Sequence, residues 1–176
     1  VLKQVMEAET KAINQIKSAI NDNPNDIAAL LIEPIQGEGG DNHFRREFFA
    51  ELRQICDENE IIFIMDEVQT GMGITGKMWA HEHYGVKPDI LSFGKKTQVC
   101  GILAGPRIDE VEKNVFVESS RINSTFGGNL TDMWRFKIIL DIIRDENLVE
   151  NARIQGQYIQ EQMKGLETEF PAYVTN

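Results

Sequence analysis

The sequence predicts an α/β fold with a mostly parallel sheet, one antiparallel strand, and helices on both faces. Two observations carry this prediction. Short apolar runs of strand length alternate along the chain with longer segments whose apolar residues recur at helical spacing. One pair of apolar runs is separated by only seven residues, 94–100, which is too short for a parallel crossover and therefore predicts antiparallel neighbours.

The amino-terminal half is expected to open with an amphipathic helix over 2–21, because apolar residues recur at helical spacing until a turn-forming stretch. Residues 27–32 then form an almost unbroken apolar run, which predicts a strand buried on both faces. A glycine-containing loop over 34–42 leads to a helix over 44–58 and a second buried strand over 61–65. Together these elements predict a β-α-β unit.

The remaining elements continue the alternation. We expect a glycine-rich loop, a short helix, a third strand, the reversed strand and two long helices, in that order over 71–76, 78–84, 89–93, 101–104, 130–145 and 148–169. The chain begins with Val1 rather than Met, and residues 170–176 resemble the start of a new element. We therefore expect it to be a piece of a longer protein.

The composition limits the partners. The chain has 176 residues and a net charge of −10, with no basic patch, so nucleic acid and anionic membrane surfaces should repel it. Its apolar runs fall far short of the roughly 18 residues that a membrane-spanning helix needs. Two cysteines, Cys56 and Cys100, are too few for a disulfide framework and are expected to be packed thiols. These observations favour a cytoplasmic protein.

Residues that could take part in catalysis or binding follow three of the predicted strands, at the position where α/β proteins bind ligands. They are Glu33 with its glycine loop, Asp66 with the residues to Gly71, and Lys95 with Lys96. A carboxylate and a lysine at neighbouring strand ends suggest a pyridoxal phosphate site, because a lysine forms a Schiff base with the aldehyde and a carboxylate pairs with the pyridinium nitrogen. The residues alone leave open that Asp66 caps a turn and that Lys95 is a solvated loop lysine.

Other motifs favour different sites less well. The glycines of 71–76 have dinucleotide-binding spacing, but no acidic residue follows about 20 positions on. With Lys77 the stretch approaches a phosphate-binding loop, but Met78 replaces the hydroxyl that binds magnesium, so a Mg-dependent nucleotide hydrolase is the less favoured alternative. His81 and His83 are two residues apart and would point to different helix faces, so we expect no metal site.

Four stretches occur in order: LLIEPIQGEGG, FIMDEVQTGMGITGKMWA, PDILSFGKK and STFGGN. Together they resemble class III pyridoxal-phosphate aminotransferases of fold type I, over nearly the whole chain. The resemblance implies that 1–147 form the central-to-carboxyl part of the cofactor-binding large domain and that 148–176 lead into a small carboxyl-terminal domain. After the Schiff-base lysine most of the family has a small-residue run ending in Gly-Gly. Here KKTQVCGILAGPR and SRINSTFGGN instead resemble the L-lysine 6-aminotransferase subgroup.

The resemblance assigns roles to five cofactor residues. Lys95 matches the lysine that forms the Schiff base, and Asp66 matches the partner of the pyridinium nitrogen. Val68 matches a residue that packs on one ring face, and Gln69 a hydrogen-bonding partner near the ring hydroxyl. Thr125 matches a threonine that reaches from a second subunit to the cofactor phosphate, which implies a homodimer.

Two further residues match substrate positions. Glu38 matches an acidic residue that sorts substrates by pairing with an arginine, and Asn123 matches a substrate-side position. The resemblance implies that the turn that binds the cofactor phosphate within the same subunit precedes Val1. It also implies that the arginine that binds the substrate α-carboxylate follows Asn176.

The function implied is transfer of the ε-amino group of L-lysine to 2-oxoglutarate, giving 2-aminoadipate 6-semialdehyde and glutamate. Another ω-aminotransferase, for ornithine or 4-aminobutyrate, is the nearest alternative, and an inactive fragment is another. We expect the isolated 176 residues to be inactive and to aggregate, because strand edges and apolar faces would be bare.

Overall fold

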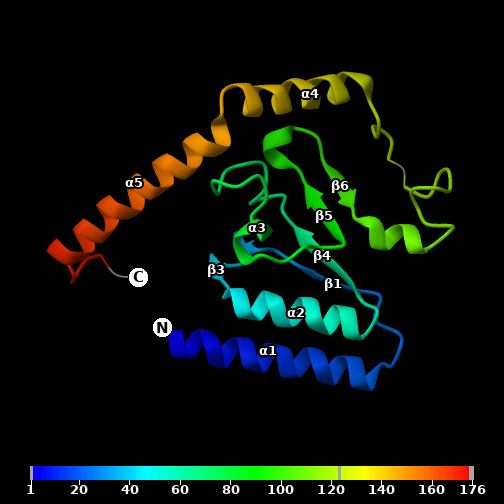
Figure 1. The fold of residues 1–176 in the computed structure, drawn as a ribbon, viewed down its shortest axis with the longest axis horizontal. Helices are drawn as coiled ribbons and strands as arrows, with labels where there is room; N and C mark the ends of the chain where they lie inside the picture. The colour runs from blue at the N-terminus through cyan, green and yellow to red at the C-terminus, as the bar shows by residue number, and fades with distance from the viewer. Residues whose placement is uncertain (1, 123, 175–176) are drawn as a thin grey trace.

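The computed structural model describes residues 2–122 and 124–174 (Figure 1). Its main sheet has four strands in the order β1-β4-β5-β6, which span Ala29–Ile32, Ile62–Asp66, Ile90–Phe93 and Gly101–Ala104. The first three strands are parallel, and β6 runs antiparallel to β5. The predicted α/β class, with a mostly parallel sheet and one reversed strand, is confirmed.

Two helices cover one face of the sheet. Helix α1 (Leu2–Asp22) and helix α2 (Arg46–Glu58) lie side by side in Figure 1. Alternate residues of β4, Phe63 and Met65, point toward them and are fully buried. The core cluster on this face also contains Ile13, Phe48, Phe49, Leu52, Ile55, Cys56, Ile61 and Val86.

A buried ion pair fixes α1 against the start of α2. Both carboxylate oxygens of Glu9 are used: Oε1 accepts from the Arg45 backbone N–H at 2.8 Å and Oε2 from Arg45 Nε at 2.6 Å. The Glu9 side chain is 6% exposed, so this desolvated carboxylate needs both donors.

The two carboxyl-terminal helices contact the end of β5 and the glycine-rich loop. Helix α4 (Leu130–Asp145) places Phe136 against Phe93 at the end of β5, with ring centroids 5.3 Å apart. Helix α5 (Leu148–Glu169) begins against the glycine-rich loop, where Val149 and Arg153 lie so close that no side chain fits at Gly73 or Gly76. The division at residue 147/148 into two domains stays a prediction.

Five short elements differ from the prediction. The loop over 34–42 contains a small antiparallel hairpin, β2 (Ile35–Gln36) with β3 (Asn42–His43). Helix α3 covers only His81–Tyr84, and two 3-10 helices, Lys95–Thr97 and Pro106–Glu110, were not predicted. Elements of two to five residues are too short to show a periodic pattern.

The second face of the sheet carries exposed apolar side chains. Leu31 of β1 is 64% exposed and Ile102 of β6 is 42% exposed. The prediction that β1 is buried on both faces is therefore wrong, because its Leu30 and Ile32 are partly buried on one face and Leu31 is exposed on the other. The thiols also differ from the expectation, because Cys56 is buried but Cys100 is exposed. Within residues 2–122 and 124–174, no helix combines the length and the apolarity that crossing a membrane requires. Aggregation of the isolated chain stays a prediction.

Candidate functional site

The alternation of β4 decides where Asp66 lies. Met65 points into the core, so Asp66, the last residue of the strand, lies on the opposite face of the sheet. Its neighbour in β5 is Ser92, whose Oγ donates to Asp66 Oδ1 at 2.9 Å. The Val68 backbone N–H donates to the same oxygen at 3.0 Å. Among the described residues, no donor is bound to the other oxygen, Oδ2.

A cavity of about 200 Å³ lies at this end of the sheet. It brings together five of the predicted site residues, Glu38, Asp66, Val68, Gln69 and Lys95, with Glu33. The lining comes from the ends of β1, β4 and β5 and from the loop that carries the β2–β3 hairpin. The expected crevice at the carboxyl ends of the strands is therefore present, and it combines three carboxylates, an amide and one amine.

Lys95 enters the cavity from the turn after β5. Its backbone adopts the left-handed conformation, with φ of 52°, which is uncommon for a residue other than glycine and occurs often at functional sites. Lys95 Nζ donates to Gln69 Oε1. A side chain at Gly94 would come within 3.1 Å of Cys100 Sγ and 3.5 Å of Val68 Cγ1, so this turn packs closely beside the cavity.

Glu67 holds the loop that follows the site. Its side chain is fully buried and accepts four hydrogen bonds: from Thr70 Oγ1, from the Ala80 and His81 backbone N–H groups, and from His81 Nδ1, at 2.6–3.1 Å. These bonds close the chain from 67 to 81 into a compact turn. At Gly71 a Cβ atom would lie 2.7 Å from the Trp79 ring, so only glycine fits. Val68 and Gln69 are thereby presented on a rigid support.

Lys95 and Lys96 lie in different environments. Lys96 does not line the cavity of Asp66; it lines a separate apolar cavity of about 330 Å³ between the glycine-rich loop and helices α4 and α5. Its Nζ donates to the Gln69 backbone carbonyl at 2.7 Å. Burial and the positive charge of Lys95 lower the pKa of Lys96.

The two other predicted site residues lie elsewhere. Thr125 is exposed in the segment before α4 and does not line the cavity. Asn123 lies outside the described residues. Sequence reasoning gave no role to two residues that support the site: Ser92, which it did not single out, and Glu67, which it placed only within the stretch after Asp66. Ser92 could have been recognised only from the strand register, which pairs it in β5 with Asp66 at the end of β4.

The glycine-rich loop is not an open phosphate cradle. Three of its backbone N–H groups, those of Gly71, Gly73 and Gly76, already donate to carbonyl groups within 67–78. Lys77 points to the Glu82 carbonyl, to which its Nζ donates at 3.1 Å. The three glycine N–H groups and the Lys77 amine are therefore already engaged within the loop and its neighbouring turn, and not directed at a phosphate.

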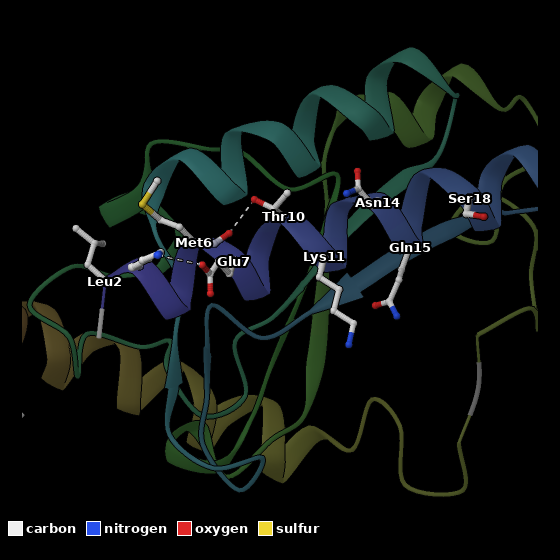
Figure 2. A pocket seen from close by; sticks show the side chains of 9 residues that line it. Leu2, Met6, Glu7, Thr10, Lys11, Asn14, Gln15 and Ser18 are labelled. Atoms are coloured by element: carbon white, nitrogen blue, oxygen red, sulfur yellow. Dashed lines mark hydrogen bonds and ion pairs between the residues drawn. The ribbon is translucent and has the colours of Figure 1, made fainter.

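Another hollow, on the surface of α1, lies away from this site. Its volume is about 1060 Å³, and its nine lining residues all come from α1. Figure 2 shows these side chains along the helix. Two of them form an exposed ion pair, Lys3 with Glu7 at 3.9 Å, and Thr10 Oγ1 donates to the Met6 carbonyl. The groove is the outer side of a single helix and contains no converging reactive groups. Over the part of the chain that the structure describes, no cluster of three potential metal ligands occurs.

Comparison with known proteins identifies the family of this chain. Residues 1–175 match the family described as Aminotransferase class-III. The chain belongs to this family. The L-lysine-epsilon aminotransferase of Mycobacterium tuberculosis is 54% identical over 166 residues, which are 94% of this chain and 37% of that protein. The enzyme of the same name from Amycolatopsis lactamdurans is 46% identical over 97% of this chain and 38% of its own length.

A solved structure of the lysine aminotransferase from M. tuberculosis superposes with a TM-score of 0.90 at 53% identity, covering 96% of this chain and 39% of that one. Other ω-aminotransferases are more distant. Ornithine aminotransferase from Staphylococcus carnosus and 4-aminobutyrate aminotransferase from Emericella nidulans are 37% and 36% identical, over 95% and 99% of this chain and 41% and 34% of theirs. The chain thus spans little more than a third of the length of the lysine enzymes that it matches.

Proposed function

We propose that this chain is part of an aminotransferase that uses pyridoxal phosphate to move the ε-amino group of L-lysine to 2-oxoglutarate, giving 2-aminoadipate 6-semialdehyde and glutamate. The observation that carries the proposal is the cavity in which the Lys95 amine, the Gln69 amide and the Asp66 carboxylate converge. The similarity to lysine-epsilon aminotransferases, which exceeds that to the ornithine and 4-aminobutyrate enzymes, supports the choice of lysine.

The groups around the cavity fit this cofactor. When bound, pyridoxal phosphate supplies an aldehyde that condenses with amines and a ring that withdraws electrons from the reacting carbon. Asp66 Oδ2 is the available acceptor for a protonated ring nitrogen, because Oδ1 is already used by Ser92 and Val68. Val68, half-buried beside Gly94, offers an apolar surface to a ring.

Lys95 would bind the cofactor through Nζ and, once displaced by the substrate amine, move a proton at the reacting carbon. Its bond to Gln69 Oε1 orients Nζ within the cavity. A general base must lie within hydrogen-bond reach of the proton that it moves, so this orientation is part of the proposed role. Gln69 itself is held against Gly37, where a Cβ atom would lie only 3.2 Å from Gln69 Cγ.

Two substrates with different charges must use this cavity in turn. Glu38 is exposed on the glycine-containing loop and lines the cavity, so its carboxylate can pair with a cationic group when lysine is bound. 2-Oxoglutarate brings a second carboxylate of its own, which would compete for the same cation. Glu38 is therefore the residue we assign to sorting the two substrates, with Asn123 assigned to the substrate side by resemblance alone.

The proposal is tested with the protein at full length. Purified protein is supplied with 2-oxoglutarate and either L-lysine, L-ornithine or 4-aminobutyrate, and glutamate formation is measured. We expect the highest kcat/KM with L-lysine and none above background for Lys95→Ala. A higher kcat/KM for ornithine or 4-aminobutyrate would establish the alternative donor, and ATP hydrolysis without transamination would contradict the proposed class of reaction.

We further propose that the protein acts as a cytoplasmic homodimer in which Thr125 contacts the cofactor phosphate of the partner subunit. The exposed position of Thr125, outside the cavity of its own chain, is compatible with a role in a second copy. Mixing inactive Lys95→Ala with Thr125→Ala subunits tests this. A contact between subunits would restore about a quarter of the sites by random pairing, whereas a contact within one subunit would restore none.

A further inference from the structure

We propose that Lys96 is a positioning residue for the reaction proposed above: its ammonium group holds the main chain of Gln69, and Gln69 in turn fixes the amine of Lys95. The inference rests on the proposed function, because it concerns the amine that would bind the cofactor. It goes beyond that function by giving the second lysine of the pair a separate task.

Gln69 is held by two lysines at once. Its side-chain Oε1 accepts from Lys95 Nζ, and its backbone carbonyl accepts from Lys96 Nζ at 2.7 Å. Because both lysines belong to the same single turn of 3-10 helix, the two bonds fix the end of β4 to the turn after β5. Losing the Lys96 bond would leave Gln69 attached to this turn through its flexible side chain alone.

The surroundings keep Lys96 in this position. The cavity around it is lined by Met72, Gly73 and Ile74 of the loop, by Ile139, Ile142 and Ile143 of α4 and by Leu148 and Ala152 of α5. None of these residues carries a charge or a hydrogen-bonding side chain. The Gln69 carbonyl is therefore the hydrogen-bond acceptor that an ammonium group needs in apolar surroundings.

Lys96 also adds positive charge beside Lys95. The charged groups that act on Lys96 are Lys95 from its own turn, whose charge lowers the pKa of Lys96, and Glu67 from the end of β4, whose charge raises it. Lys95 is faced by Glu33, Glu38 and Asp66 across its cavity. Replacing Lys96 by a neutral residue would therefore remove a positive charge beside Lys95 while the three carboxylates stay in place.

The sequence supports a specific role for this second lysine. The resemblance to the family implies that small residues commonly follow the Schiff-base lysine. This chain instead has KKTQVCG. A small residue at 96 could neither reach the Gln69 carbonyl nor carry charge. The pair of lysines is thus a departure that needs a local reason, and the two bonds to Gln69 provide one.

The test uses the full-length holoenzyme and its visible absorption, which changes with pH as the lysine-linked nitrogen of the cofactor loses its proton. Lys96→Met and Lys96→Gln both remove the charge, and Lys96→Arg keeps it. Lys77→Met is the matched control, because Lys77 also donates to a backbone carbonyl but lies outside the cavity. We expect the pH midpoint of the absorption change to rise by roughly 0.5–1 pH unit in Lys96→Met and Lys96→Gln. It should stay unchanged in Lys96→Arg and in Lys77→Met.

The outcomes separate this inference from the proposed function. An unchanged midpoint in whichever of Lys96→Met and Lys96→Gln folds would overturn the role of Lys96 while leaving the proposed function intact. An equal rise in Lys77→Met would also overturn it, since the effect would then be general. Unaltered protein that binds pyridoxal phosphate without any pH-dependent visible band would overturn the proposed function and this inference with it.

Discussion

Two aspartates at opposite ends of neighbouring strands have opposite surroundings. Asp89 directly precedes β5, and its Oδ2 accepts from the Phe63 backbone N–H at 2.8 Å, from Arg53 at 3.0 Å and from Arg107 at 3.3 Å. Asp66 ends β4 and accepts from two neutral donors, both at Oδ1. Among the described residues no cation pairs with Asp66.

The difference separates a structural carboxylate from one with free capacity to bind. The charge of Asp89 is compensated by two guanidinium groups, which leaves no need for a further ligand. The charge of Asp66 is oriented but not compensated, and it lies beside a cavity. An oriented carboxylate without a cationic partner is suited to bind a cationic group from outside the chain.

The largest effect we expect is on the activity of Asp66→Asn in the full-length protein. An amide cannot keep the ring nitrogen of the cofactor protonated, so turnover should fall by roughly 10²–10⁴-fold while the cofactor still binds. The melting temperature should change by no more than about 2 °C, because no ion pair is broken. Steady-state rates and thermal melting measure the two effects, and normal turnover would refute the assigned role.

Asp89→Ala should show the opposite pattern. It removes one of the two carboxylates that the Arg53 and Arg107 guanidinium groups share and leaves them only the more exposed Asp57, while the Arg53 side chain is only 16% exposed. Removing one member of such a pair costs about 3 kcal/mol, so the melting temperature should fall by several degrees. Turnover per folded molecule should stay close to that of the unaltered protein. If turnover fell as steeply as in Asp66→Asn, the division into structural and functional aspartates would be wrong.

The comparison also shows what sequence reasoning can reach. The apolar runs located β1, β4 and β5 to within two residues, and the strand-end rule placed Asp66 and Lys95 at one crevice. Both depend on local patterns that a single chain displays. The choice between Lys95 and Lys96 could not be made from periodicity, because the turn after β5 gives Lys95 a left-handed backbone that directs the two side chains into different cavities.

Sequence reasoning also could not identify residues that act through partners far away in the chain. Ser92 and Asp66 are 26 residues apart and meet only through the register of two strands. Glu67 reads as a second acid beside Asp66, yet it is fully buried and bonded to the chain 13 and 14 residues further on. Which of two adjacent acids faces a cavity depends on where the strand ends, and element boundaries are the least certain part of a sequence prediction.

A smaller effect is expected for Glu38→Gln, which changes a third carboxylate, exposed on the loop that carries the β2–β3 hairpin. Losing a charge-assisted pair of roughly 1.5–3 kcal/mol should shift the balance between the lysine and oxoacid half-reactions by about ten- to a hundredfold. The two half-reactions are followed separately by the cofactor absorption. Asp41→Asn, in the same loop but outside the cavity, is the control. Equal effects on both half-reactions would leave Glu38 with a purely local role.

The smallest effect should come from Cys56, which packs in the core beside the Asp89 ion pairs. Burial raises the pKa of its thiol from 9.0 to about 11. Because the folded state holds this proton more tightly than the unfolded state, the stabilisation is complete below pH 9 and is lost as the pH rises through 11. The loss attributable to Cys56 reaches about 2 kcal/mol at pH 11. Melting temperatures between pH 8 and pH 11 should therefore fall less steeply in Cys56→Ala than in Cys100→Ala, whose replaced thiol is exposed. Parallel slopes for the two variants would show that the Cys56 thiol does not contribute to the alkaline loss of stability.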